Sequence, residues 1–153
     1  MRVRAADLTK LLLAEARKSH ACRLLMTIPG VGAITATSYA TAIEEPSNFK
    51  NSRAVGAWLG LTSRRYQSGE VDYSGRVSRR GDRHLRGLLY EAALVILTRS
   101  KIQSDLRTWA LKLKERVGTK RAAVGLARKL AVTMHAMLKT GSVFNPASQP
   151  ISL

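Results

Sequence analysis

The sequence predicts a mainly α-helical domain that contains one Gly/Arg-rich segment, at about residues 60–81, which is irregular or forms a short hairpin. Two observations carry this prediction. Apolar residues recur at the three- and four-residue spacing of amphipathic helices over most of the 153 residues. The longest segment that departs from that spacing is 60–81, and it holds four of the chain's eleven glycines, which is typical of loops and hairpins.

Apolar periodicity and capping residues predict the helices in order. Their ranges are 7–27, Gly32 to about Ile43, a short helix from Ser52, Arg83 to about Arg99, Ser104 to Val117, and 120–139. Polar residues suited to helix N-caps stand at several of these starts, namely Asp7 or Thr9, Ser52, Asp82 and Ser104. Residues 44–48 are expected to form a loop, because Pro46 disfavours helical geometry in the residue before it. The tail 142–153 is expected to be irregular.

The last helix is expected to pack through one apolar face. The residues of this face are Ala127, Leu130, Ala131, Met134 and Leu138. At about 100° per residue, Arg121, Arg128 and Lys129 are expected on roughly the opposite side. Trp58 and Trp109 are expected as core anchors.

The charge of the chain is strongly positive. It has 26 Lys and Arg against 10 Asp and Glu, a formal net charge of +16 and a pI near 11.1. Arginines outnumber lysines, and the guanidinium group binds phosphate through two parallel hydrogen bonds. Because the composition is otherwise that of a globular protein, a nucleic acid is the expected partner.

Several classes of protein are excluded by composition. Cys22 is the single cysteine, so the chain has no internal disulfide framework and a cysteine-based zinc site is very unfavourable. No apolar run approaches the roughly 20 residues of a membrane span. The N-terminus lacks the apolar core of a signal peptide. A bacterial cytoplasmic protein, nucleoid-associated when bound to DNA, is therefore expected, with no membrane partner.

The segment 24–43 has the pattern of a helix-hairpin-helix DNA-binding unit. Two expected helices are joined by the tight turn Pro29-Gly30-Val31-Gly32. Gly30 and Gly32 would let the turn backbone approach a phosphate closely, and the second helix begins with unpaired N–H groups. On this motif alone, a plain helix–helix turn is an equally good interpretation.

The insert and the residues after it form the most basic part of the chain. Seven arginines stand there within 23 residues, at positions 64, 65, 76, 79, 80, 83 and 86. Such a patch can hold several phosphates. Its serines could also attack a phosphodiester, with arginines neutralising the developing charge and His84 or a nearby acid taking the proton. From composition alone, a loop that only coats nucleic acid is the better-supported interpretation.

No metal site is expected in this chain. His20 with Cys22, and His135 in the last helix, lack the partners that a metal ion needs. The ten carboxylates are scattered and form no cluster of the kind used in two-metal catalysis.

Four runs of sequence resemble a known family. They are LLMTIPGVGAITA, FKNSRAVGAWLGLTSRRYQSGE, DYSGRVSRRGDRHLRGLLYEAA and WALKLKERVGTKRAAVGLARKLAVTMHAML. In order and spacing they resemble the C-terminal transposase domain of the insertion-sequence 110/116/902 class, which is related to the Piv-type DNA invertases. The resemblance implies a domain over 24–141, preceded in 1–23 by the end of a coiled coil or linker helix.

The resemblance also implies a reaction and its residues. Members of the class transpose DNA through a serine that becomes covalently linked to it as phosphoserine. By position in the Ser-Gly element, Ser68 corresponds to that serine, and Ser74 and Ser78 are the alternatives. The implied phosphate ligands are Arg64, Arg65, Arg76, Arg79, Arg80 and Arg83.

Full-length members carry a RuvC-like domain with an acidic DEDD cluster that binds Mg²⁺. No such set stands in these 153 residues, so the resemblance implies a truncated or split copy that is inactive alone and takes Mg²⁺ only through the missing domain. The implied partners are DNA, a structured guide RNA, and further copies of the chain or a RuvC-like partner chain. A non-catalytic DNA- or RNA-binding remnant is the alternative function, and a basic ribosome-associated protein is a third.

Overall fold

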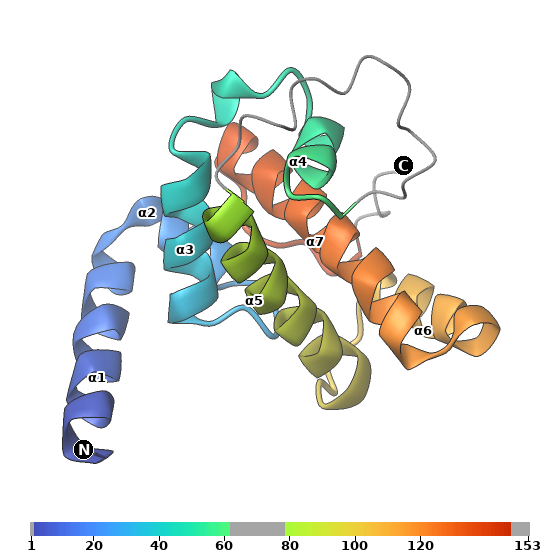
Figure 1. Cartoon of the computed structure of the whole chain (residues 1–153), viewed down its shortest axis with the longest axis horizontal. Helices are drawn as coiled ribbons and strands as arrows, with labels where there is room; N and C mark the ends of the chain where they lie inside the picture. The colour runs from blue at the N-terminus through green and yellow to red at the C-terminus, as the bar shows by residue number, and fades with distance from the viewer. Residues whose placement is uncertain (1, 62–78, 148–153) are drawn as a thin grey trace.

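The computed structural model describes residues 2–61 and 79–147, and over these residues the chain is helical with no strand (Figure 1). The α-helices are α1 (Arg2–Lys18), α2 (His20–Leu25), α3 (Ala33–Ile43), α4 (Ser52–Trp58), α5 (Arg79–Thr98), α6 (Asp105–Val117) and α7 (Thr119–Thr140). A short 3₁₀ helix, η1, covers Pro46–Asn48. The prediction of a mainly α-helical chain is confirmed. The body of the expected insert lies outside the described residues.

Helix α7 is the centre of the fold, and it packs against α5, α6, α4 and α2. Figure 1 shows it running diagonally through the molecule, with α4 and α5 beside it. Its expected apolar face is buried except for Leu138, which is partly exposed. The expectation that Lys129 projects outward is wrong. The side chain is only 6% exposed, because α6 covers that side of α7 and brings the ring of Trp109 to 4.4 Å from the Lys129 amine.

The first expected helix is interrupted at Ser19. Ser19 has extended backbone geometry and caps α2, since its hydroxyl accepts a hydrogen bond from the Cys22 N–H at 3.3 Å. A serine competes well for the backbone at such a position, so it starts a new helix and changes the direction of the chain. Neither Asp7 nor Thr9 is a cap, because α1 already begins at Arg2.

Two other expected helix starts lie at different residues. Asn51 caps α4 by accepting from the Ala54 N–H at 3.0 Å, and Ser52 is the first helical residue. Helix α5 begins at Arg79, before the expected cap Asp82, because a single glycine in the first turns costs a helix only about 1 kcal/mol. The expected Ser104 cap is confirmed by its bond from the Arg107 N–H at 3.1 Å.

Helix α1 projects from the body of the molecule (Figure 1). Leu8 and Leu11 on this helix are 65% and 64% exposed. At the other end of the chain, residues 142–147 carry no regular helix or strand but are held in place. The Phe144 N–H donates to Thr27 Oγ1 at 2.9 Å, and the Pro146 carbonyl accepts from the Asp105 N–H at 2.8 Å.

None of the helices in the described ranges is both long and apolar enough to cross a membrane.

Candidate nucleic-acid interface

The insert begins where α4 ends, and a glycine, Gly60, ends this helix. Gly60 has a left-handed φ of +71°. Its N–H donates to the Ala57 carbonyl at 3.0 Å, and the next N–H, of Leu61, donates to the Gly56 carbonyl at 2.9 Å. These two bonds form a Schellman motif, which stops a helix and turns the chain sharply away from it. The path of the chain into the insert is therefore set by local geometry.

Arg86 joins this helix end to α5. Its Nη1 donates to the carbonyl oxygen of Leu59 at 3.3 Å. A Cβ atom placed on Gly60 would lie only 2.6 Å from the same nitrogen. The positive φ at position 60 thus favours glycine, and a side chain there would displace the Arg86 guanidinium. Arg86 has an internal role that separates it from the other arginines of this region.

Some of the predicted site residues lie within the described part of the chain, and others lie outside it. Those that lie outside it are Ser68, Ser74, Ser78, Arg64, Arg65 and Arg76. Arg79 and Arg80 are the first two residues of α5, and their side chains are not among those that the structure describes. Arg83 and His84 are exposed in the next turn of the helix. The first two turns of α5 therefore carry Arg83 toward solvent, next to the end of the insert.

The Pro29–Gly32 turn uses its two glycines differently. Gly30 has a φ of +92°, and an added Cβ would lie 3.1 Å from both the Ala92 carbonyl oxygen and Ile96 Cγ1 of α5. Gly30 therefore serves a close contact between the turn and α5. Gly32 has open space around it and starts α3, and among the described residues no side chain caps that helix start. Only Gly32 has the open surroundings that an approaching phosphate needs.

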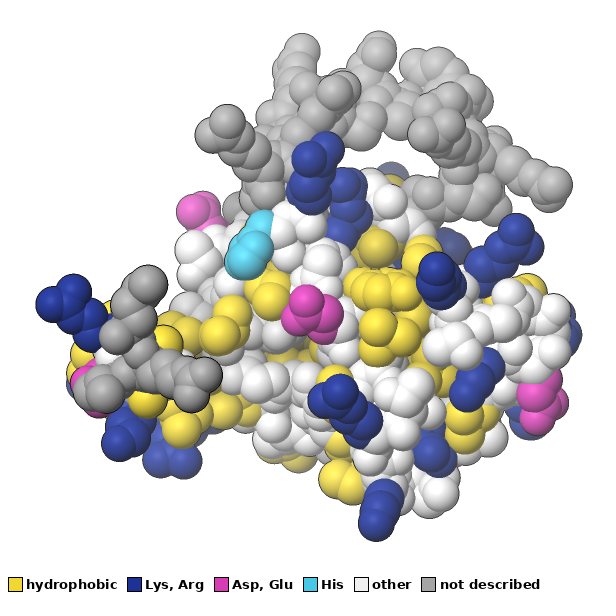
Figure 2. Space-filling view, turned by 60° about the horizontal axis from the view of Figure 1, so that its bottom comes forward, with side chains coloured by type: hydrophobic (Ala, Val, Ile, Leu, Met, Phe, Trp, Pro, Cys, Tyr) yellow, Lys and Arg dark blue, Asp and Glu magenta, His cyan; other side chains and the backbone are white. Residues whose placement is uncertain are grey.

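The structure does not bring this turn together with the arginines at the start of α5. The turn contacts α5 at Ala92, which stands 13 residues after Arg79 in the sequence. At 1.5 Å rise per residue, this separation is about 20 Å along the helix. The two predicted DNA-binding regions therefore lie toward opposite ends of α5. Figure 2 shows one face of the molecule, on which Lys and Arg side chains are widely spread and acidic ones are sparse.

Comparison with known proteins assigns the chain to a family. The family described as "Transposase IS116/IS110/IS902 family" matches residues 22–108, more than half of the chain and a span that includes the turn, the insert and all of α5. The chain belongs to the IS116/IS110/IS902 transposase family. The family membership expected from the four sequence runs is confirmed.

Individual relatives agree with this assignment. The chain is 35% identical to the transposase for insertion sequence element IS1111A of Coxiella burnetii over 86% of its length, covering 36% of that protein. It is 38% identical to the transposase for insertion sequence element IS1328 of Yersinia enterocolitica over 79% of its length, again covering 36%. The pilin gene-inverting protein of Moraxella bovis is 26% identical over 83% of this chain, which covers 39% of it. The chain thus spans little more than a third of these relatives.

A serine and a histidine of this transposase-family chain form a hydrogen-bonded pair that the sequence did not predict. His135 is fully buried. Its Nδ1 lies 2.8 Å from Ser52 Oγ, and its Nε2 lies 2.8 Å from the Pro46 carbonyl oxygen. Since a carbonyl only accepts, Nε2 carries the proton and Nδ1 accepts from the serine. The pair ties α7 to η1 and α4, which is a core role for His135.

The sequence also did not predict which residues surround Arg128 and Lys129. Arg128 lies across α4 at Gly56, where an added Cβ would be 3.3 Å from Arg128 Cγ. Burial first, and then the neighbouring charge of Arg128, hold the pKa of Lys129 below its usual value. The sequence signal for the contact between α4 and Arg128 was Gly56. A glycine inside a helix often marks a place where another part of the chain packs closely.

A Mg²⁺ site does not fit the part of the family chain that the structure describes. A magnesium ion needs carboxylate oxygens gathered in one place. Among the residues described, no three His, Cys, Asp or Glu side chains are grouped so that they could hold a metal ion. Cys22 is buried, and His20 is exposed away from it on the surface.

Proposed function

We propose that this chain is the serine-bearing part of a DNA transposase, which binds DNA and carries out strand transfer with Ser68 as the nucleophile. The observation that carries the proposal is the family match over residues 22–108, which includes the whole Gly/Arg-rich insert. The names of the relatives, two transposases and a gene-inverting protein, support a reaction that breaks and rejoins DNA.

In the proposed reaction, the hydroxyl oxygen of Ser68 attacks a backbone phosphorus atom. A bond forms between the serine oxygen and phosphorus, the bond from phosphorus to one sugar oxygen breaks, and the strand is held as a phosphoserine ester. The serine proton passes to a base, for which His84 or an acid of the insert is the candidate, and the departing sugar oxygen takes up a proton. Attack by a sugar hydroxyl of another strand reverses these steps and releases the serine.

The arginines of the insert and of α5 are the proposed phosphate ligands. A pentavalent phosphorus carries extra negative charge on its oxygens, and guanidinium groups aimed at those oxygens lower the barrier. Arg83 is exposed near the start of α5, the end of the helix that follows the insert, and it stands close in sequence to Arg79 and Arg80. The proposed set is completed by Arg64, Arg65 and Arg76. Arg86 is left out of the set because it bonds to Leu59.

We further propose that the segment 24–43 acts as a helix-hairpin-helix contact to the DNA backbone. Support comes from Gly32, which is exposed and starts α3 with open space around it. Backbone N–H groups at a helix start bind phosphate without reading sequence. This contact would lie about 20 Å from the start of α5 along that helix, so the two regions would hold different phosphates of the same DNA, at the nucleoid of a bacterial cell.

Oligomerisation and a partner domain belong to the same proposal. Exposed Leu8 and Leu11 on the projecting helix α1 favour the end of a coiled coil. A RuvC-like domain would supply the acidic cluster and its Mg²⁺, and a structured guide RNA would select the target. The described residues of this chain gather no group of ligands that could hold a metal ion.

The test is a covalent-trapping assay with labelled transposon-end DNA and Mg²⁺, with and without a RuvC-like domain and guide RNA from a full-length relative. We expect a protein–DNA adduct on a denaturing gel only when the chain is complemented. The adduct should disappear with Ser68→Ala and persist with Ser74→Ala and Ser78→Ala. An adduct that persists in Ser68→Ala would overturn the assignment of the nucleophile. Salt-sensitive DNA binding without any adduct would leave a non-catalytic binding remnant.

A further inference from the structure

We propose that helix α7 carries a second phosphate-binding surface, formed by Arg128 and Arg121, which holds the backbone of a nucleic acid beyond the end of α4. The proposal rests on the proposed function of DNA binding and adds to it a contact outside the insert and the Pro29–Gly32 turn. The two residues are referred to below as the α7 arginine pair.

The first argument is the position of the pair on α7. Arg121, Arg128 and His135 are spaced by seven residues, which is nearly two helical turns, so they lie along one face of the helix. Helix α4 covers this face at His135 through Ser52 and at Arg128 through Gly56. Beyond Arg128 the cover ends, and Arg121 is exposed. The α7 arginine pair thus begins where α4 stops.

The second argument is the state of the Arg128 side chain. It is partly exposed and lies against Gly56, and its Nε is buried with no hydrogen-bond partner in the described part of the chain. A buried donor without a partner is costly, and proteins seldom keep one without a use. An arginine held for internal structure would bond to a carbonyl, as Arg86 does with Leu59. The donors of Arg128 are instead available to an acceptor on another molecule. A small rotation of the guanidinium would bring them to it.

The third argument is charge. Helix α7 contains no Asp or Glu over Thr119–Thr140, so nothing on the helix itself neutralises the pair. Lys129, the neighbour of Arg128, has its amine over the Trp109 ring and is buried on a different side of the helix. The two arginines stand about 10 Å apart along the helix. That distance corresponds to roughly three base-pair steps of rise along the axis of a DNA duplex.

These features favour the sugar–phosphate backbone of DNA as the occupant. Planar guanidinium groups recognise phosphate through paired donors, and spaced positive charges without acidic partners suit a polyanion of regular charge spacing. Val124, which lies between the two arginines in sequence, is 44% exposed, so the surface between them is open.

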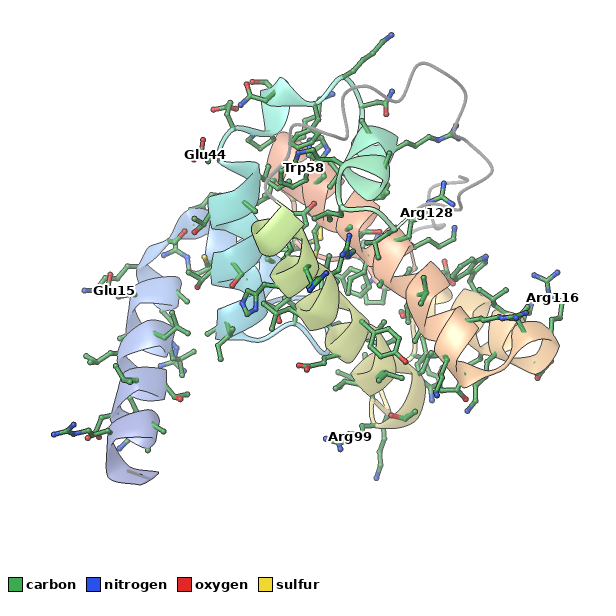
Figure 3. All side chains as sticks on the ribbon, in the orientation of Figure 1. Glu15, Glu44, Trp58, Arg99, Arg116 and Arg128 are labelled. Atoms are coloured by element: carbon green, nitrogen blue, oxygen red, sulfur yellow. The ribbon has the colours of Figure 1, made fainter. Side chains whose placement is uncertain are left out.

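The test compares three variants that each lose one positive charge. Arg128→Met and Arg121→Met remove the pair, and Arg99→Met is the matched control, at the far end of α5 from Arg128 (Figure 3). The readout is the affinity for a labelled duplex without transposon sequence, measured by fluorescence anisotropy at several salt concentrations. Each pair variant should lower the slope of log K against log salt by about one unit, and Arg99→Met should leave it nearly unchanged. Arg128→Lys should keep most of the slope but bind more weakly, because it loses the fork geometry.

A thermal melt separates binding from structure. If Arg128 only braced α4, Arg128→Met would lower the melting temperature, whereas the proposal expects it unchanged or higher because the buried Nε is removed. Equal salt slopes for Arg128→Met, Arg121→Met and Arg99→Met, with wild-type binding intact, would overturn the inference and leave the proposed function standing. A lowered slope together with no Ser68-dependent adduct would support the inference and contradict the catalytic proposal. Absence of any wild-type binding would overturn both.

Discussion

Arg86 Nη1 donates a hydrogen bond to the carbonyl oxygen of Leu59, 27 residues earlier in the sequence, at 3.3 Å. Leu59 closes α4 and Arg86 stands in the second turn of α5, so this bond joins the two helices between which the Gly/Arg-rich insert begins and ends. The ends of the insert are thereby held near each other by a residue outside it.

The first prediction concerns this bond. Arg86→Met keeps the aliphatic stem and removes the donor, and we expect the free energy of unfolding to fall by about 1 kcal/mol. The measurement is urea denaturation followed by circular dichroism. Arg83→Met is the control, because Arg83 is exposed one turn earlier and surface substitutions change stability by less than about 0.5 kcal/mol. Equal stability of the two variants would show that the Leu59 contact contributes nothing.

The second prediction distinguishes the two glycines of the Pro29–Gly32 turn. Gly30→Ala places a Cβ 3.1 Å from the Ala92 carbonyl oxygen in a residue with φ of +92°, so we expect a loss of about 2 kcal/mol or more. Gly32→Ala enters open space at ordinary φ and should cost less than about 1 kcal/mol. Melting curves of the two variants test this difference. Similar melting temperatures would argue against the close contact between the turn and α5.

Local rules predicted much of the fold, and tertiary contacts account for most of the errors. The Ser104 cap, the Gly32 start of α3 and the break at Gly118 depend on neighbouring residues only, and the sequence predicted all three. The burial of Lys129 depends on Trp109, which is contributed by α6. A helical pattern cannot show which neighbour will cover a given side, so periodicity alone placed Lys129 in solvent.

The candidate site likewise has one part that the sequence predicted and another that depends on tertiary contacts. Family resemblance pointed to Ser68 and the insert arginines, and these stay predictions because they lie outside the described residues. Arg128 was expected on the outer side of α7, but its contact with Gly56 depends on how α4 packs. The link between His135 and Ser52 spans 83 residues of sequence, and no local pattern indicates such a pair.

The third prediction concerns the hydrogen-bonded pair of Ser52 and His135. Ser52→Ala removes the donor to His135 Nδ1 and leaves a buried acceptor unpaired, which should lower the free energy of unfolding by about 1–2 kcal/mol. Ser47→Ala is the control, because Ser47 is exposed and bonds only locally to Glu45. Nuclear magnetic resonance of the imidazole should show a slowly exchanging proton on Nε2, which donates to Pro46. A proton found on Nδ1 instead would contradict the assigned tautomer.

The fourth prediction concerns Lys129 and pH. Burial, and then the charge of Arg128, lower the pKa of Lys129 in the folded chain, while the unfolded chain keeps the ordinary value of 10.5. Between the lowered value and 10.5 the unfolded state binds more protons, so stability rises with pH in that range. Below it the protonated lysine carries its full burial cost, which its contacts, including the one with the Trp109 ring, offset only in part.

Lys129→Met keeps the packed stem without the charge. We therefore expect it to raise the free energy of unfolding at pH 7 by a few tenths to about 1 kcal/mol, and the advantage over wild type should shrink as pH approaches 10. Urea denaturation of both chains at pH 7 and pH 9.5 measures the difference, with Lys139→Met, an exposed lysine on the same helix, as control. Burial also raises the pKa of Tyr39, but this phenol is present in each chain, so its effect cancels in the comparison. A variant less stable than wild type at pH 7 would mean that the contacts of the Lys129 amine, including the one with the Trp109 ring, outweigh the cost of burying the charge.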